Sequence, residues 1–91
     1  MLQIVWSSEA TDDLRILIKY VSQRNPPAAS RMLMLLENAI TPAVEHPYLF
    51  RVGRVAGTRE IVVHPNYILV YRVDVGLLKV VRVLHARQQY P

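Results

Sequence analysis

The strongest constraint on the fold is a run of three β-prone segments joined by two short turns between residues 58 and 85. The segments TREIVVH (58–64), YILVYRV (67–73) and LLKVVRVLH (77–85) are rich in β-branched and aromatic residues. The links HPNY (64–67) and DVG (74–76) contain the proline, asparagine and glycine that tight turns favour. Because such short turns join neighbouring antiparallel strands, the sequence predicts a three-stranded meander.

Two amphipathic helices are predicted ahead of the meander. Apolar residues recur at helical spacing from about Ser8 to Arg24, behind serines that suit an N-cap. The sequence Asn25-Pro26-Pro27 ends this helix and starts a second one, which Pro42 stops near Thr41. Since the link is so short, we expect the two helices to form an antiparallel hairpin.

The order of elements defines the fold class. LQIVW (2–6) is a further β-prone run, and residues 46–57 contain the proline and glycines of a loop. The chain therefore predicts an α+β domain of order β-α-α-β-β-β, a mainly antiparallel sheet with the N-terminal helical hairpin packed on one face. We expect one domain spanning residues 1–91. In the middle strand, alternation predicts one side in the core and the other on an open face. The core side consists of Tyr67, Leu69, Tyr71 and Val73, and the open side of Ile68, Val70 and Arg72.

Composition excludes several classes of protein. A hydrophobic fraction of 52% excludes a disordered chain, and the absence of cysteine excludes disulfides and cysteine-based zinc sites. The N-terminus lacks the basic region of a signal peptide, and the apolar runs are too short to cross a bilayer. The three histidines have no metal-ligand spacing, and His46 and His64 each precede a turn proline. We expect a cytoplasmic protein with no metal, no cofactor and no membrane partner.

The net charge of +4 is unevenly distributed. Residues 1–45 carry four Lys/Arg and five Asp/Glu, a net of −1, whereas residues 46–91 carry seven and two, a net of +5. Nine of the eleven cationic residues are arginines, which suit planar contacts with phosphates and carboxylates. The basic half predicts an anionic partner, either a nucleic acid or an acidic protein segment.

One set of polar residues lies on the strands and at the end of the last one. Arginine groups can hold phosphates, and His85 or Tyr90 can move a proton, as a metal-independent ribonuclease requires. The same residue types equally suit binding to a charged protein surface. A simpler alternative is that His85 and Arg87 only cap the strand end. The candidate residues are Arg59, Arg72, Arg82, His85, Arg87, Gln88 and Tyr90.

The sheet half carries a family resemblance. GTREIVVHPNYILVYRV and VLHARQQYP resemble the RelE/ParE superfamily of type II toxin–antitoxin toxins, and most closely its ParE-like, plasmid-stabilisation branch. The helical half agrees in length, capping and order. The resemblance implies a toxin held inactive by a cognate, ParD-like antitoxin with a DNA-binding N-terminal part. An extended acidic, amphipathic antitoxin segment would cover both the surplus apolar surface and the basic half.

The resemblance leaves two targets. ParE-like members are associated with inhibition of DNA gyrase, whereas RelE-like members cut mRNA on the ribosome with sheet cations and a terminal acid or base. The arginine that nucleases place in the middle strand corresponds to Ile68 here. The arginine at the end of the last strand has a counterpart in Arg87, and Tyr90 only approximates the downstream tyrosine.

Three functions therefore compete. The leading hypothesis is a non-enzymatic gyrase inhibitor whose target-facing or antitoxin-facing residues are Arg59, Arg72, Arg82, His85, Arg87 and Gln88. The alternative is a ribosome-dependent mRNA endonuclease with His85, Arg87 and Tyr90 as catalytic candidates. The third is an inactive module that only binds antitoxin.

Overall fold

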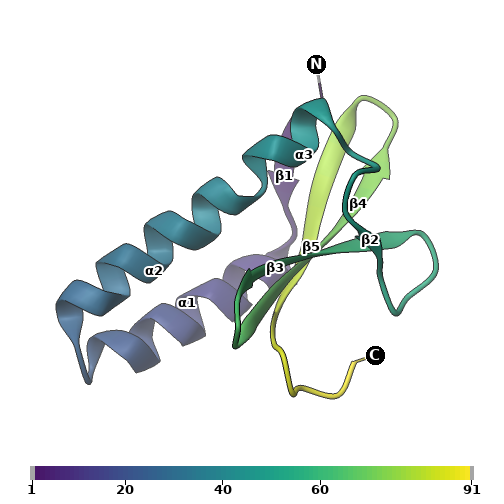
Figure 1. The fold of residues 1–91 in the computed structure, drawn as a ribbon. Helices are drawn as coiled ribbons and strands as arrows, with labels where there is room; N and C mark the ends of the chain where they lie inside the picture. The colour runs from purple at the N-terminus through teal and green to yellow at the C-terminus, as the bar shows by residue number, and fades with distance from the viewer. Residues whose placement is uncertain (1, 91) are drawn as a thin grey trace.

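The structure is a computed structural model that describes residues 2–90, and it has the α+β order that the sequence predicts. Figure 1 shows a pair of long helices on one side and a twisted sheet on the other. Along the described chain the elements are β1 (Gln3–Trp6), α1 (Ser8–Ser22), α2 (Pro26–Ala39), α3 (Thr41–Glu45), β2 (Arg51–Val52), β3 (Thr58–His64), β4 (Tyr67–Asp74) and β5 (Leu77–His85).

The sheet has the strand order β1-β5-β4-β3-β2. Strands β3, β4 and β5 form the predicted antiparallel meander, and β2 continues it with two antiparallel pairs to β3. Strand β1 lies parallel to β5, with Gln3 opposite Leu77 and Trp6 opposite Val80. The predicted mainly antiparallel sheet is confirmed, and the chain that joins the parallel strands β1 and β5 runs through the helices and the other three strands.

The helices begin where side chains cap them. Ser7 accepts a hydrogen bond from the Ala10 N–H, and Asn25 accepts one from the Ala28 N–H. Helix α1 ends at Ser22, two residues before the predicted end, and α2 ends at Ala39. The chain then continues as the short helix α3 because Pro42 is tolerated in a first turn, where its missing N–H costs nothing. The predicted loop from residue 46 also contains β2, which the sequence did not indicate.

The main core lies between the helical hairpin and the sheet. Leu69, Tyr71, Leu78 and Val80 are fully buried there, which confirms the predicted core side of β4. The Tyr71 hydroxyl donates a hydrogen bond to the Pro47 carbonyl oxygen at 2.5 Å. Burial raises the pKa of Tyr71, and the nearby positive charge of Arg59 opposes this shift.

The prediction of an open second face was wrong for the middle of β4. Ile68 is 4% exposed and Val70 is fully buried, and both pack with Leu84 in a second apolar cluster. Ala86 and Tyr90 pack against this cluster, so the C-terminal segment covers the face that the helices leave open. The alternating pattern identified two faces but gave no sign that the chain end would turn back over one of them.

Candidate functional site at the end of strand β5

The polar C-terminal residues form a compact turn where β5 ends. The Ala86 N–H donates to the Asn66 carbonyl at 2.7 Å, and the Gln88 N–H donates to the His85 carbonyl at 2.9 Å. The Gln88 side-chain oxygen accepts a hydrogen bond from the His85 N–H at 3.3 Å. These bonds hold His85, Arg87 and Gln88 together on one exposed end of the sheet, and we call these three residues the terminal cluster.

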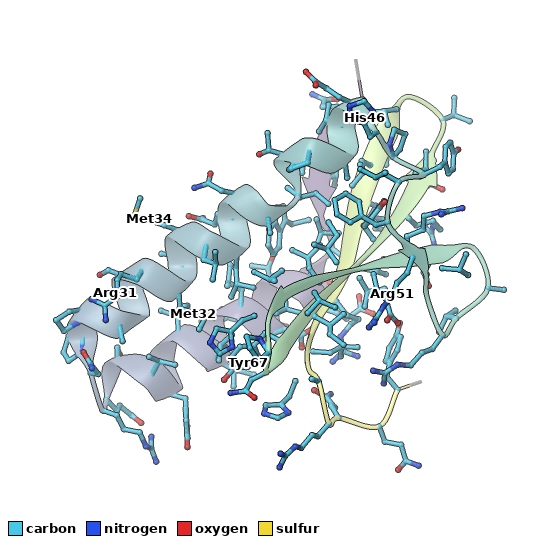
Figure 2. The ribbon with its side chains drawn as sticks, in the orientation of Figure 1. Arg31, Met32, Met34, His46, Arg51 and Tyr67 are labelled. Carbon is cyan, nitrogen blue, oxygen red and sulfur yellow. The ribbon has the colours of Figure 1, made fainter. Side chains whose placement is uncertain are left out.

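Tyr67 joins two histidines beside the terminal cluster. It pairs with His85 across the strands, and the two rings meet edge to face with centroids 5.5 Å apart. The His64 ring lies 5.8 Å from the Tyr67 ring. Figure 2 labels Tyr67 at this end of the sheet. The sequence predicts Tyr67 in the core, but it is only half-buried and lines a surface groove. His64, predicted only as a turn residue, lies beside it because the tight HPNY turn brings the two together.

Both histidines use the same nitrogen to support a turn. The Nδ1 atom of His64 accepts from the Asn66 N–H, and the Nδ1 atom of His85 accepts from the Arg87 N–H, each at 3.1 Å. An Nδ1 acceptor places the proton of the neutral ring on Nε2. His64 therefore has the turn role that its HP sequence predicts. His85 combines a turn contact with an Nε2 donor at an exposed position.

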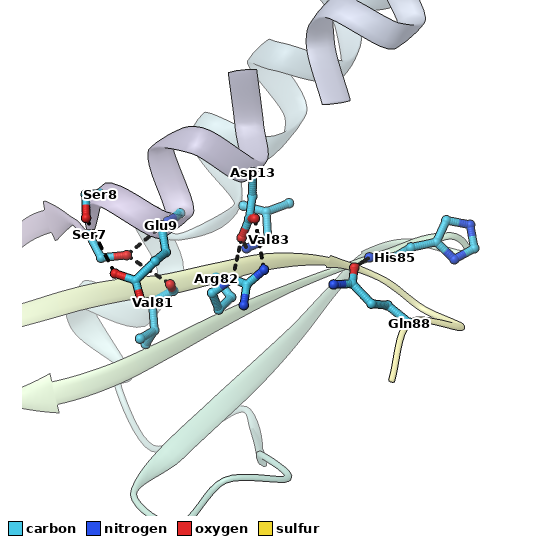
Figure 3. A network of polar contacts seen from close by, with 10 residues as sticks. Ser7, Ser8, Glu9, Asp13, Val81, Arg82, Val83, His85 and Gln88 are labelled. Atoms are coloured by element: carbon cyan, nitrogen blue, oxygen red, sulfur yellow. Dashed lines mark hydrogen bonds and ion pairs between the residues drawn. The ribbon is translucent and has the colours of Figure 1, made fainter. Parts of the chain in front are cut away.

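Arg82 is occupied by an ion pair within the protein (Figure 3). Its guanidinium donates to the Asp13 carboxylate through Nε at 2.7 Å and through Nη2 at 3.0 Å. The hydrogen bond to Asp13 raises the pKa of Arg82, so the guanidinium stays charged. Asp13 also accepts from the Val83 N–H at 2.9 Å. The carboxylate from α1 thus closes part of the β5 edge, and the sequence analysis missed it because Asp13 is far away in the chain.

Arg59 and Arg72 do not join the terminal cluster. Arg59 donates to the Tyr48 and Phe50 carbonyls at 3.0 and 2.8 Å and lies over the Tyr48 ring. Arg72 pairs with Asp74 at the opposite end of β4 from Tyr67. The six arginine, histidine and glutamine candidates therefore do not form a single surface in this structure.

The buried carboxylate of Glu60 on β3 is linked to the C-terminal tail through Arg54. Glu60 is 4% exposed and accepts hydrogen bonds from Arg51 Nε and Nη2 and from the Arg54 N–H. Arg54 in turn donates from Nη1 to the Gln88 carbonyl at 3.1 Å. The guanidinium carbon of Arg82 lies over the Tyr90 ring, 5.7 Å from the centroid of that ring. These contacts hold the tail, and Tyr90 packs against the second apolar cluster.

A groove runs from α1 to the terminal cluster. It has a volume of about 370 Å³, and its exposed apolar wall consists of Ile16 and Tyr20, which are 67% and 53% exposed. His85 and Gln88 form its other wall, beside Tyr67. Large apolar side chains at this exposure next to a polar cluster are typical of a surface that contacts another macromolecule.

Within residues 2–90 no three His, Cys, Asp or Glu side chains gather closely enough to hold a metal ion. None of the helices described is long and apolar enough to cross a membrane. The candidate site consists of the terminal cluster, its two aromatic neighbours His64 and Tyr67, and the groove beside α1.

Comparison with known proteins identifies the family. A sequence model of the ParE toxin of type II toxin-antitoxin systems, parDE, matches residues 4–90. The chain belongs to this family. It is thus a type II toxin of the RelE/ParE superfamily, and the resemblance noted in the sequence is confirmed.

Individual relatives agree with this family. The chain is 40% identical over 86 residues to the toxin RelE2 of Caulobacter vibrioides, covering 94% of this chain and 97% of that protein. It is 32% identical over 90 residues to the putative toxin Y4kP of Sinorhizobium fredii, covering 98% and 93%. The chromosomal ParDE system of P. aeruginosa contains a chain with a TM-score of 0.83 and 18% identity, covering 93% of this chain and 96% of that one. At this identity the structural likeness shows the fold alone.

Proposed function

We propose that this toxin arrests growth by binding DNA gyrase, that it does so without catalysing a reaction, and that a cognate ParD-like antitoxin neutralises it. Membership of the ParE family supports both the target and the antitoxin partner. The terminal cluster and the adjoining α1 groove form the surface that we assign to gyrase. Its exposed apolar wall and the single arginine of the terminal cluster suit a protein partner better than a polyphosphate.

The observation that carries this proposal is the environment of Ile68. A nuclease of this superfamily would place an arginine there, but Ile68 is buried against Val70 and Leu84 beneath the tail. The neighbouring cations cannot replace it, because Arg82 is paired with Asp13 and Arg59 is bonded to backbone carbonyls. The face of the sheet that would hold a phosphate is therefore apolar and covered.

The test is a supercoiling assay with purified gyrase and antitoxin-free toxin. We expect supercoiling to be inhibited by the wild type, and Arg87→Ala to weaken inhibition at least about tenfold, as truncation of a central interface arginine does. Arg72→Ala is the matched control, because its guanidinium pairs with Asp74 at the far end of β4. Gyrase left untouched at a large molar excess of toxin would refute the proposal.

The alternative function is a ribosome-dependent mRNA endonuclease. One observation favours it: His85 and Arg87 are both exposed at the strand end, so an imidazole that can transfer a proton lies beside a guanidinium that can hold a phosphate. A translation reaction separates the two functions, since a nuclease yields cut mRNA and a gyrase inhibitor leaves it intact. His85→Gln, which keeps polarity but cannot exchange a proton, would abolish cleavage. Harmless overexpression without antitoxin would instead identify an inactive, antitoxin-binding module.

A further inference from the structure

The carboxylate of Glu60 is buried on the face of the sheet that the C-terminal tail covers. Glu60 lies opposite Val70 on β4, and Val70 lies opposite Arg82 on β5, so the three side chains share one face. Ala86 and Tyr90 pack on the apolar part of this face. The Glu60 side chain is only 3% exposed. Because a buried charge is costly unless it is paired and hydrogen-bonded, the partners of this carboxylate are held in place with it.

Two arginines pair with Glu60 in different ways. Arg51 on β2 donates from Nε and Nη2 to one carboxylate oxygen, at 3.1 and 2.9 Å. Arg54, in the loop between β2 and β3, donates its backbone N–H to the other oxygen at 3.1 Å, and its Nε lies 3.7 Å from that oxygen. The Arg54 guanidinium thus meets Glu60 with Nε, which leaves its Nη1 atom for a second acceptor.

The loop that carries Arg54 is fastened to the start of β3. The Gly53 N–H donates to the Thr58 carbonyl at 2.8 Å, and the Thr58 N–H and hydroxyl both donate to the Val55 carbonyl, at 3.1 and 2.6 Å. A Cβ at Gly53 would collide with the Thr58 hydroxyl and would lie 3.2 Å from the Thr58 carbonyl carbon. The loop therefore needs glycine to lie this close to β3, and it presents Arg54 from a closed turn.

The far end of Arg54 contacts the terminal cluster. Its Nη1 atom donates to the Gln88 carbonyl at 3.1 Å. The Gln88 N–H donates to the His85 carbonyl, and the Gln88 side-chain oxygen accepts from the His85 N–H (Figure 3). Figure 1 shows the tail turning back toward the loop between β2 and β3. An unbroken series of contacts therefore runs from Glu60 through Arg54 and Gln88 to His85.

We propose that Arg54, held by Glu60, is a positioning residue that fixes the terminal cluster in the conformation that its target binds. A planar guanidinium can contact a carboxylate and a backbone carbonyl at once, whereas the ammonium of a lysine is a single point of charge. Holding the turn in advance lowers the cost of ordering it on binding. This inference rests on the proposed function, and it adds a residue outside the terminal cluster on which that surface depends.

The first test measures hydrogen exchange of the His85 and Gln88 amides in free toxin. Arg54→Lys keeps a positive charge beside Glu60 but loses the contact with Gln88, so both amides should exchange about fivefold faster than in the wild type. Arg51→Lys is the matched control, because it makes the same substitution at the same carboxylate, and the side-chain hydrogen bonds of Arg51 within residues 2–90 go to Glu60. In this control both rates should stay within about twofold of the wild type. Equal exchange of these amides in the two variants would overturn the proposal.

Urea denaturation shows whether Arg54 supports the terminal cluster or the whole fold. Arg51→Lys should lower the urea midpoint at least as much as Arg54→Lys, because the Arg51 guanidinium makes two hydrogen bonds to the carboxylate. An Arg54→Lys protein that fails to fold while Arg51→Lys folds would show that Arg54 supports the whole domain. That result would also count against a positioning role.

Gyrase inhibition tests the consequence for the target. Arg54→Lys should weaken inhibition about fivefold, and Arg51→Lys should leave it within about twofold of the wild type. In an Arg87→Ala background, Arg54→Lys should weaken inhibition by no more than about twofold further, because both residues act through the terminal cluster. Fully additive effects would show that Arg54 contacts gyrase by itself, which contradicts the proposal.

The two kinds of failure can be told apart. If the wild type leaves gyrase untouched, the proposed function fails, and amide exchange still decides whether Arg54 holds the terminal cluster. If the wild type and Arg54→Lys inhibit gyrase equally, the proposed function stands and the positioning role of Arg54 is wrong.

Discussion

The pairing of Asp13 with Arg82 gives the sharpest stability prediction, because an adjacent aspartate provides a matched control. Asp13 accepts three hydrogen bonds, two from Arg82 and one from the Val83 backbone. Its side chain is 17% exposed and that of Arg82 is 27% exposed. Asp12 instead pairs with Arg15 on the surface of α1, with side chains 57% and 70% exposed.

The expected magnitudes follow from these surroundings. Asp13→Asn removes the charge and leaves one acceptor oxygen for three donors, and a charge-assisted hydrogen bond contributes about 1.5–3 kcal/mol. We expect Asp13→Asn to lower the free energy of unfolding by about 2–3 kcal/mol, which allows for partial solvent exposure. Asp12→Asn should cost only about 0.3–0.5 kcal/mol, as exposed helix pairs do.

Urea denaturation followed by the fluorescence of Trp6, the only tryptophan, measures both variants. For a domain of this size, the Asp13→Asn loss corresponds to a drop in Tm of about 10 °C or more. In high salt the loss of unfolding free energy caused by Asp12→Asn should shrink. The loss caused by Asp13→Asn should largely persist, because the Asp13–Arg82 pair is shielded from solvent. If Asp13→Asn costs no more than Asp12→Asn, then Asp13 does not secure the β5 edge.

Three further predictions concern stability. Tyr71→Phe should cost about 1 kcal/mol at neutral pH by removing the bond to the Pro47 carbonyl. Burial raises the pKa of Tyr71, so above about pH 10 the folded state keeps the phenolic proton that the unfolded state loses. The free energy of unfolding should therefore fall above about pH 10, and it should fall less in Tyr71→Phe. Alkaline denaturation measures both curves. Gly76→Ala should cost about 1 kcal/mol in a thermal melt because its φ is +71°, while Val75→Ala, at a fully exposed side chain, should cost little. Ile68→Arg should cost at least about 3 kcal/mol in urea, because it buries a charge under the tail, and a near-neutral result would mean that this face is open.

Much of the fold could be predicted because its signals are local. The turns HPNY and DVG specify hairpins, and β3, β4 and β5 lie where the three β-prone segments predict them. The capping residues Ser7 and Asn25 likewise mark helix starts within one residue. Two elements escaped prediction: β2 is too short to carry a periodic pattern, and α3 contains Pro42 in its first turn, although this proline predicts the end of a helix.

The candidate site was predicted less completely, because residue type does not reveal which charges are already paired. Arg82 and Arg87 lie on the same strand end and look equivalent in the sequence. In the structure Arg82 is bonded to Asp13, 69 positions away, whereas Arg87 is exposed with only its backbone N–H bonded to His85. The roles of His64 and Tyr67 depended in the same way on cross-strand register, which the alternation of side chains alone does not give.

The sequence by itself therefore determined the helices, the meander, the charge asymmetry and the family, since each depends on neighbouring residues or on a continuous motif. The tertiary structure alone decided three further features: that Arg82 is paired with Asp13, that the tail buries Ile68, and that Asp13 closes part of the β5 edge. These features arise from contacts between segments far apart in the chain. Their free energies depend on burial and geometry, which no local pattern of residues encodes.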